Sequence, residues 1–228
     1  MLESFDLSVI VHALPFLFGV GMVFTIKLTV LAMAGGVVFG TLLALMRLSR
    51  STLLRAVAGV YVNVIRSIPL VLVIFWFFFL VPYIGGWIMR SDSPIEVGAF
   101  TSALVTFVMF EAAYYCEIIR AGILGVPRGQ VQAAQALGMN HRMAMTYVIL
   151  PQAVRSMLPL LLTQSIILLQ EVSLVYVVSI TDFVGAAAAI AQRDGRLLEM
   201  YLFVAVVYFC ICFTLSSFVR RMRQLQNG

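Results

Sequence analysis

Long apolar runs are the feature that most constrains this chain. Several of them reach the roughly 20 residues that a helix needs to cross the hydrocarbon core of a bilayer. Of the 228 residues, 62% are hydrophobic and only 11% are charged, far too few charges for a surface that faces water. We therefore expect an all-α polytopic transmembrane bundle that forms one domain over residues 1–228.

Charged and proline-containing stretches divide the apolar sequence into five predicted spanning helices. Their approximate ranges are 27–46, 58–81, 98–123, 153–180 and 198–219. The first range is about 30 Å long at helical rise, one hydrocarbon thickness. Residues 1–26 then form either an interfacial helix or a tilted extension of that span. Pro69 lies inside the second range, where it should kink the helix and free a carbonyl.

Small residues recur every four positions along the first predicted span, at Ala32, Gly36, Gly40 and Ala44. Such a stripe lets another helix approach closely. We interpret it as packing within the bundle, with a dimer seam as the alternative.

The residue types and their spacing give no support for a metal site, a disulfide or a cofactor. The three cysteines all lie inside apolar runs, where a thiol behaves as a small hydrophobic group. With only two histidines beside them, no ligand set has usable spacing, and we expect no metal and no cofactor. The net charge of +5 comes from arginines at helix ends, so it reports membrane orientation and predicts no nucleic-acid partner.

One long polar interruption, residues 127–153, separates the third and fourth predicted spans. Pro127 ends the preceding helix, and Gly138 is free to adopt the left-handed conformation that closes a short helix. A second short helix is expected from about Asn140 to Ile149, stopping before Pro151. Two short helices joined at a glycine form a compact knob, which suits a groove on a partner protein.

Arginines are distributed very unevenly between the two sides that five spans define. If the polar loop of residues 127–151 is cytoplasmic, only Arg90, Arg193 and Arg196 lie outside. The inner or inner-interface arginines are Arg47, Arg50, Arg55, Arg66, Arg120, Arg128, Arg142, Arg155, Arg220, Arg221 and Arg223. The positive-inside rule then places the N-terminus outside and the C-terminus in the cytoplasm.

Specific motifs surround and fill the polar loop. Gln132-Ala133-Ala134 is followed by Gly138 and then by Ile149-Leu150-Pro151, and the segment Tyr114–Ile123 precedes it. This pattern resembles the cytoplasmic coupling loop of importer permeases of the ATP-binding cassette class, in the polar amino-acid family. The resemblance extends over about residues 21–215. One departure is Gln132, where the family usually has glutamate, so any salt bridge made there is lost.

The resemblance implies a complete transport assembly in a bacterial inner membrane. Its partners would be two ATPase subunits, a second identical or homologous permease, and an extracytoplasmic amino-acid-binding protein. The residues it assigns to ATPase coupling are Gly129, Gln132, Ala133, Ala134, Gly138 and Pro151. Segments 168–183 and 193–203 look most like the permeases for glutamate and aspartate, with glutamine or another amino acid as the alternative.

The chain itself is not expected to be an enzyme. Its single lysine, Lys27, lies between Ile26 and Leu28, and no Gly-Lys-Ser/Thr sequence forms a phosphate-binding loop. If transport is driven by ATP, another polypeptide must therefore hydrolyse it. An ATP-independent secondary transporter or channel is the alternative from another class, but no inverted repeat supports it. A membrane scaffold without transport would leave the acids within the spans unexplained.

Polar residues inside the spans are the candidates for a substrate path. A charge in the bilayer costs about 3 kcal/mol, so each should be paired or should line a cavity. Glu117 and Arg120 are three residues apart and should form a local ion pair. Glu111 either faces the path or pairs with an arginine, and Gln164 either faces the substrate or hydrogen-bonds a neighbouring helix. Glu171, seven residues after Gln164 on the same face, completes the set.

Overall fold

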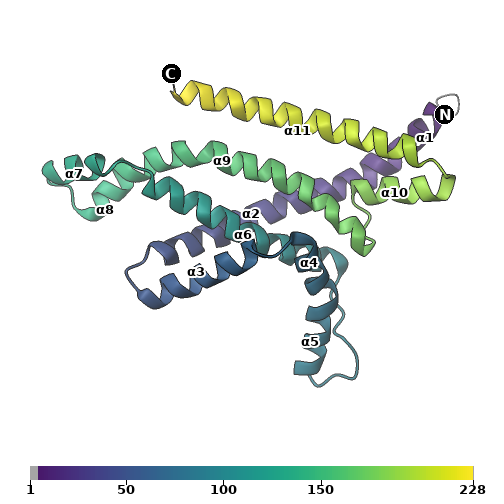
Figure 1. The fold of residues 1–228 in the computed structure, drawn as a ribbon, viewed down its shortest axis with the longest axis horizontal. Helices are drawn as coiled ribbons and strands as arrows, with labels where there is room; N and C mark the ends of the chain where they lie inside the picture. Colours follow the sequence, from purple (N-terminus) through teal and green to yellow (C-terminus); the bar gives the residue numbers. More distant parts are fainter. Residues whose placement is uncertain (1–4, 228) are drawn as a thin grey trace.

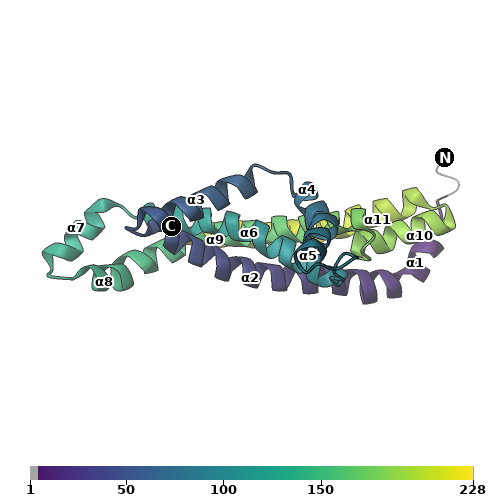
Figure 2. The same ribbon diagram turned by 90° about the horizontal axis from the view of Figure 1, so that it is seen from below.

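The computed structural model describes residues 5–227, which are helical almost throughout, with no strand among them. The helices are α1 (Leu7–Phe16), α2 (Val23–Leu48), α3 (Thr52–Arg66), α4 (Leu70–Phe75), α5 (Val81–Ile88), α6 (Ala99–Leu124), α7 (Arg128–Ala136), α8 (His141–Ala144), α9 (Leu150–Glu171), α10 (Phe183–Asp194) and α11 (Leu197–Asn227). Wider π-helical turns connect α1 to α2 (Leu17–Met22), α4 to α5 (Trp76–Leu80) and α8 to α9 (Met145–Ile149), and a 3-10 helix (Val172–Val178) follows α9. Figures 1 and 2 show an elongated molecule with α7 and α8 at one end and α1 and α10 at the other.

Five helical segments are long and apolar enough to cross a membrane, which agrees with the predicted number. They are Leu7–Leu48, Leu70–Ile88, Ala99–Leu124, His141–Val178 and Leu197–Leu225. The third and fifth lie where the sequence placed them. In the first, residues 7–26 continue the helix without a break, as the extension alternative expected.

The second span differs from its predicted range of 58–81. The chain breaks at Ser67–Pro69, so that α3 ends at Arg66 and a new helix begins at Leu70 in a different direction (Figure 1). Pro69 precedes α4 as its N-cap, with an extended ψ of 133°. Because a proline ring disfavours the helical conformation of the residue before it, Ile68 cannot continue α3. Pro69 therefore ends one helix where the sequence predicted only a kink.

The fourth span also begins earlier than predicted. No stop occurs before Pro151: the helix runs from His141 through Val178, and Pro151 lies in the first turn of α9. The turn before it is already widened, because the Leu150 N–H bonds to the carbonyl of Met145, five residues back. Such a π-turn changes the hydrogen-bond register, which lets the helix accept a proline without ending.

The pair α2 and α6 forms the centre of the bundle, and the small-residue stripe lies between them. A Cβ on Gly36 would lie 2.9 Å from Glu111 Cβ, and one on Gly40 would lie 2.8 Å from Tyr115 Cβ. Only glycine permits this close approach of the two helices. The stripe therefore packs within the chain, as expected, and does not form a seam between copies.

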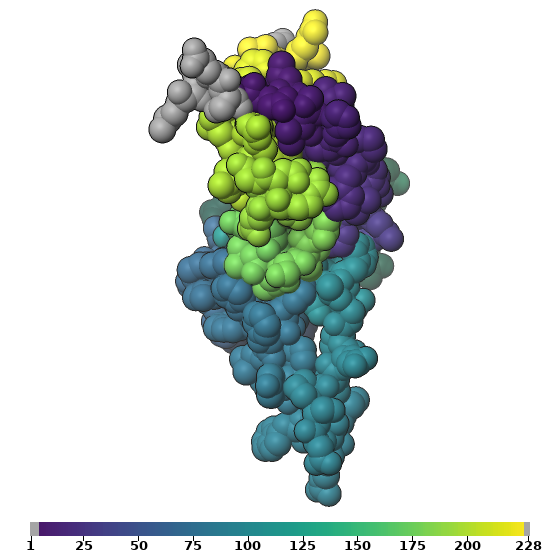
Figure 3. Space-filling view, turned by 90° about the vertical axis from the view of Figure 1, so that its right-hand side faces the viewer, coloured from purple at the N-terminus to yellow at the C-terminus, as the bar shows by residue number. Residues whose placement is uncertain are grey.

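A second core lies at the end that carries α1 and α10. Leu17, Phe183, Ala187 and Met200 are fully or almost fully buried there, between the first helix, α10 and the start of α11. The Phe183 N–H donates to Thr25 Oγ1 at 3.0 Å and ties the start of α10 to α2. Figure 3 shows the purple N-terminal segment against the yellow-green α10.

Candidate functional site

The polar loop of the sequence forms two short helices that project from one end of the bundle (Figures 1 and 2). Helix α7 starts after Pro127, and Gly138 follows it with φ +77°. The Gly138 N–H bonds to the Gln135 carbonyl and the Met139 N–H to the Ala134 carbonyl, at 2.9 and 3.1 Å. These two bonds are the pattern that closes a helix on a left-handed glycine. The predicted role of Gly138 in the turn is therefore confirmed.

Helix α8 begins with a side-chain cap, and the start of α9 is tied back to α7. Asn140 Oδ1 accepts a hydrogen bond from the Met143 N–H at 2.9 Å, which satisfies one free donor of the new helix. Gln152 Nε2 donates to Gln130 Oε1 at 3.4 Å and links α9 to α7. We call residues 127–151 the α7–α8 knob.

The knob presents most of the predicted coupling residues to solvent. Gly129, Gln132, Ala133, Gly138 and Pro151 are exposed, whereas Ala134 is buried beneath them. Two large apolar side chains were missed by the sequence analysis: Leu137 is 79% exposed and Tyr147 is 70% exposed. They add exposed apolar area to a loop whose other exposed residues are mostly small or polar. Leu137 could have been found by its position beside the glycine turn, whereas nothing in the sequence marked Tyr147.

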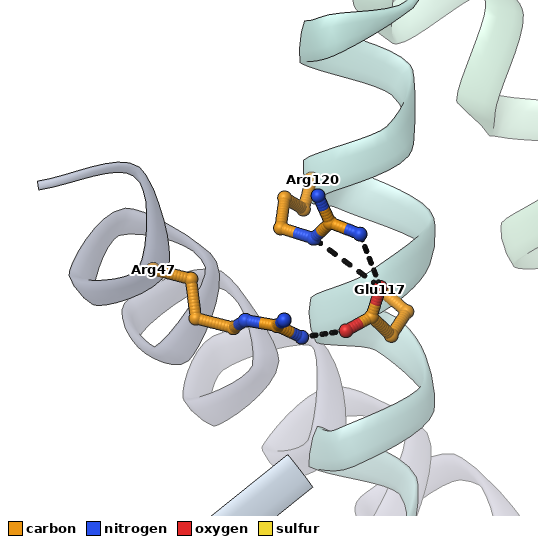
Figure 4. Close-up of polar contacts among 3 residues, drawn as sticks. All are labelled: Arg47, Glu117 and Arg120. Atoms are coloured by element: carbon orange, nitrogen blue, oxygen red, sulfur yellow. Dashed lines mark hydrogen bonds and ion pairs between the residues drawn. The ribbon is translucent and has the colours of Figure 1, made fainter. Parts of the chain in front are cut away.

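An ion cluster joins α2 to α6 near the knob (Figure 4). Glu117 pairs with Arg120 at 2.8 Å on its own helix, as predicted, and with Arg47 at the end of α2. All three side chains are largely buried, so the cluster fixes the relative position of the two central helices. The Arg47 contact could not be predicted, because 70 residues separate the partners.

A second polar group lies near the middle of α6. Gln164 Nε2 donates to both carboxylate oxygens of Glu111, at 3.2 and 3.3 Å. Glu111 is fully buried and Gln164 is 9% exposed. The partner of Glu111 is thus a glutamine and not the arginine that one alternative named. Next to this pair, the hydroxyls of Tyr115 and Ser165 are 3.0 Å apart and share a hydrogen bond.

Two further charged residues, Glu171 and Arg66, lie at the ends of α9 and α3. Glu171 ends α9 and has one buried carboxylate oxygen without a hydrogen-bond partner among the described residues. Arg66 ends α3, and its guanidinium carbon lies 5.2 Å from the centroid of the Tyr114 ring. Tyr114 is three residues from Glu111, so both side chains lie on the same side of α6.

Residues 36–225 match the family described as binding-protein-dependent transport system inner membrane component. The chain belongs to this family. The permease is 50% identical over 223 residues to the glutamate/aspartate import permease protein GltK of Escherichia coli O6:H1. This alignment covers 97% of this chain and 98% of that protein. It is 34% identical over 221 residues to the glutamine transport system permease protein GlnP of Escherichia coli K12, covering 97% of each.

The permease also resembles a solved structure along its whole length. A crystal structure of an amino acid ABC transporter with histidines superposes with a TM-score of 0.86 at 35% identity, and the match covers 97% of this chain and 99% of that one. Proteins of this family are membrane subunits of ATP-binding cassette transporters, in which a separate subunit hydrolyses ATP. The prediction of a transport subunit that is not itself an enzyme is confirmed, and a scaffold or an ATP-independent transporter is excluded.

Proposed function

We propose that this permease forms the path by which glutamate and aspartate enter the cell. The observation that carries this proposal is the 50% identity to a glutamate/aspartate import permease, which extends over 97% of the chain. The relative named for glutamine is 34% identical over the same extent. The neutral Gln164 amide in the middle of the bundle fits an acidic substrate better than a third carboxylate would, because like charges repel strongly at low dielectric.

The α7–α8 knob is the proposed contact with the ATPase. Its exposed small residues let a partner approach the backbone, and the exposed Leu137 and Tyr147 supply apolar area for a groove. At Gly129 and Gly138 no other atom lies within 4 Å of the position that a Cβ would occupy, so this side of each glycine is open to another chain. Closure of two ATPase subunits would move the two knobs of a permease pair, and the bundle would switch between inward-open and outward-open states.

The proposed orientation follows the arginines. The knob and the basic C-terminal end of α11 lie at the same end of the molecule, opposite α1 and α10 (Figure 1). The positive-inside rule places that end in the cytoplasm of a bacterial cell. The end with α1 and α10 would then receive the amino acid from an extracytoplasmic binding protein.

Reconstitution tests the substrate and the energy source together. The permease is purified with the ATPase and binding protein encoded beside its gene and placed in proteoliposomes. We expect ATP-dependent uptake of labelled glutamate that unlabelled aspartate suppresses and arginine does not. Uptake of glutamine with no uptake of glutamate would contradict the proposed substrate. Uptake that persists with a hydrolysis-deficient ATPase would contradict the proposed energy source.

A further inference from the structure

Arg66 lies farther from the end of the molecule that carries the knob than the sequence suggested. The sequence placed it at the inner interface with the other arginines. It is the last residue of α3, and the length of α3, about 20 Å, separates it from the turn at residues 49–51. The ring that it covers, Tyr114, lies ten residues from the Leu124 end of α6, which is about 15 Å. The guanidinium is therefore near the middle of a spanning helix. A charge at this depth requires an anionic partner or a polar path.

No carboxylate of the described residues fills that need. The ion pairs among residues 5–227 join Arg47, Arg120, Arg193 and Arg196 to acids, and Arg66 forms none. Its side chain is exposed on this chain and contacts the face of Tyr114. A cation over an aromatic face is held in position while the N–H groups at its edge remain free to donate.

The surroundings of Arg66 explain why a path for anions needs a cation here. Glu111 is three residues from Tyr114 on α6, and Tyr114 packs against the cluster that includes Val172, the neighbour of Glu171. Two acids thus lie around the same part of the bundle, and neither supplies a positive charge for an anionic solute. Arg66 supplies that charge, and its planar fork matches the geometry of a carboxylate.

We propose that Arg66 binds a carboxylate of the amino acid as it passes through the permease, and that Tyr114 orients the guanidinium for this contact. The inference rests on the proposed function, since it requires an amino-acid substrate. It adds a residue of α3 to the candidates Glu111, Gln164 and Glu171, which all lie on α6 and α9.

The test compares Arg66→Gln and Arg66→Lys in the complete complex with ATPase and binding protein. Arg55→Gln is the matched control, because Arg55 lies on the same helix near its basic end. We expect Arg66→Gln to lower glutamate uptake at least tenfold, which corresponds to about 1.4 kcal/mol. ATP hydrolysis stimulated by the loaded binding protein should persist, Arg66→Lys should retain part of the uptake, and Arg55→Gln should transport normally.

Two results would overturn the inference. The first is unchanged uptake by Arg66→Gln. The second is loss of the permease pair during purification of Arg66→Gln, which would assign Arg66 to a contact between the two permease chains. Binding of labelled glutamate and glutamine to the detergent-solubilised complex separates the two possible carboxylates. An equal loss for both amino acids identifies the α-carboxylate, and a loss for glutamate alone identifies the side-chain carboxylate.

The failure of this inference is distinguishable from failure of the proposed function. A wild-type complex that takes up glutamine and not glutamate overturns the proposed substrate, and the Arg66 variants are then compared with labelled glutamine. Normal glutamate uptake by both wild type and Arg66→Gln overturns the role of Arg66 alone.

Discussion

Gln164 on α9 donates its side-chain amide to both carboxylate oxygens of Glu111 on α6, at 3.2 and 3.3 Å, with both side chains buried. A buried acid without a partner is strongly destabilising, so this bond fixes the rotation of each helix about its own axis. The pair also lies beside the proposed position of the substrate. In the isolated chain the pair therefore serves packing, and a role in the substrate path is our proposal.

The first prediction concerns Gln164→Glu. It places two carboxyl groups within hydrogen-bond distance, and we expect a loss of about 3 kcal/mol in stability, with glutamate uptake strongly reduced. The thermal unfolding midpoint of the purified complex and uptake in proteoliposomes measure the two effects. The exchanged double variant Glu111→Gln/Gln164→Glu restores one amide and one acid and should recover the midpoint. Equal midpoints for wild type and Gln164→Glu would contradict the pairing.

The second prediction concerns the ion cluster in Figure 4. Glu117→Gln removes the acid that joins Arg47 to Arg120, and we expect about 1.5–3 kcal/mol of destabilisation, the range for hydrogen bonds to charged groups. The thermal midpoint of the complex is the measurement. Arg193→Gln, in the exposed pair with Asp194, is the control and should leave the midpoint unchanged. Equal midpoints for the two variants would show that the cluster does not hold α2 against α6.

The third prediction concerns Gly138→Asp in the knob. A side chain in the left-handed conformation costs about 1 kcal/mol, so the chain should still fold and insert. A charged group on the open side of Gly138 should block the groove of the partner, and uptake should be lost. Gly195→Asp is a closely matched control: Gly195 has φ +67° and an equally open Cβ position, but it lies beyond α10 at the opposite end.

Co-purification with the ATPase distinguishes these two glycine variants. We expect Gly138→Asp to lose the ATPase and Gly195→Asp to retain it, although the backbone cost is the same in both. If both variants retain it with full coupling of ATP hydrolysis to uptake, the knob is not the contact.

The fourth prediction concerns pH. Asp182, outside the spanning helices, caps α10 by accepting from the Val184 and Gly185 N–H groups at 3.0 and 2.9 Å. Burial of its carboxyl group raises its pKa from 3.8 to about 6, against the opposing effect of those hydrogen bonds. The folded chain then holds a proton that the unfolded chain releases. This contribution to stability, about 3 kcal/mol, is complete below pH 3.8 and is lost as the pH rises through about 6.

The Asp182→Asn variant isolates this effect. Asparagine still caps the helix through its amide oxygen but does not titrate. We expect the thermal midpoint of wild type to fall between about pH 4 and about pH 7, and that of Asp182→Asn to fall less. Parallel curves for the two proteins would show that Asp182 is not protonated in the folded chain.

The sequence determined the features that depend on length and on local backbone rules. The apolar runs predicted five spanning helices, because a helix in a bilayer needs about 20 apolar residues whatever it packs against. The left-handed turn at Gly138 followed from the conformational freedom of glycine, and the Glu117–Arg120 pair followed from helical spacing. Each of these depends on a continuous stretch of the sequence and not on residues brought together by folding.

Only the tertiary structure decided how prolines act and which distant side chains meet. Pro69 ends a helix and Pro151 does not: the backbone is extended at Pro69, whereas a widened π-turn leads directly into the first turn of α9, which holds Pro151. Glu111 meets Gln164 rather than an arginine because α6 and α9 are packed with those two faces together. Helical periodicity fixes which residues share a face, but the rotation of one helix against another depends on how all the side chains between them fit.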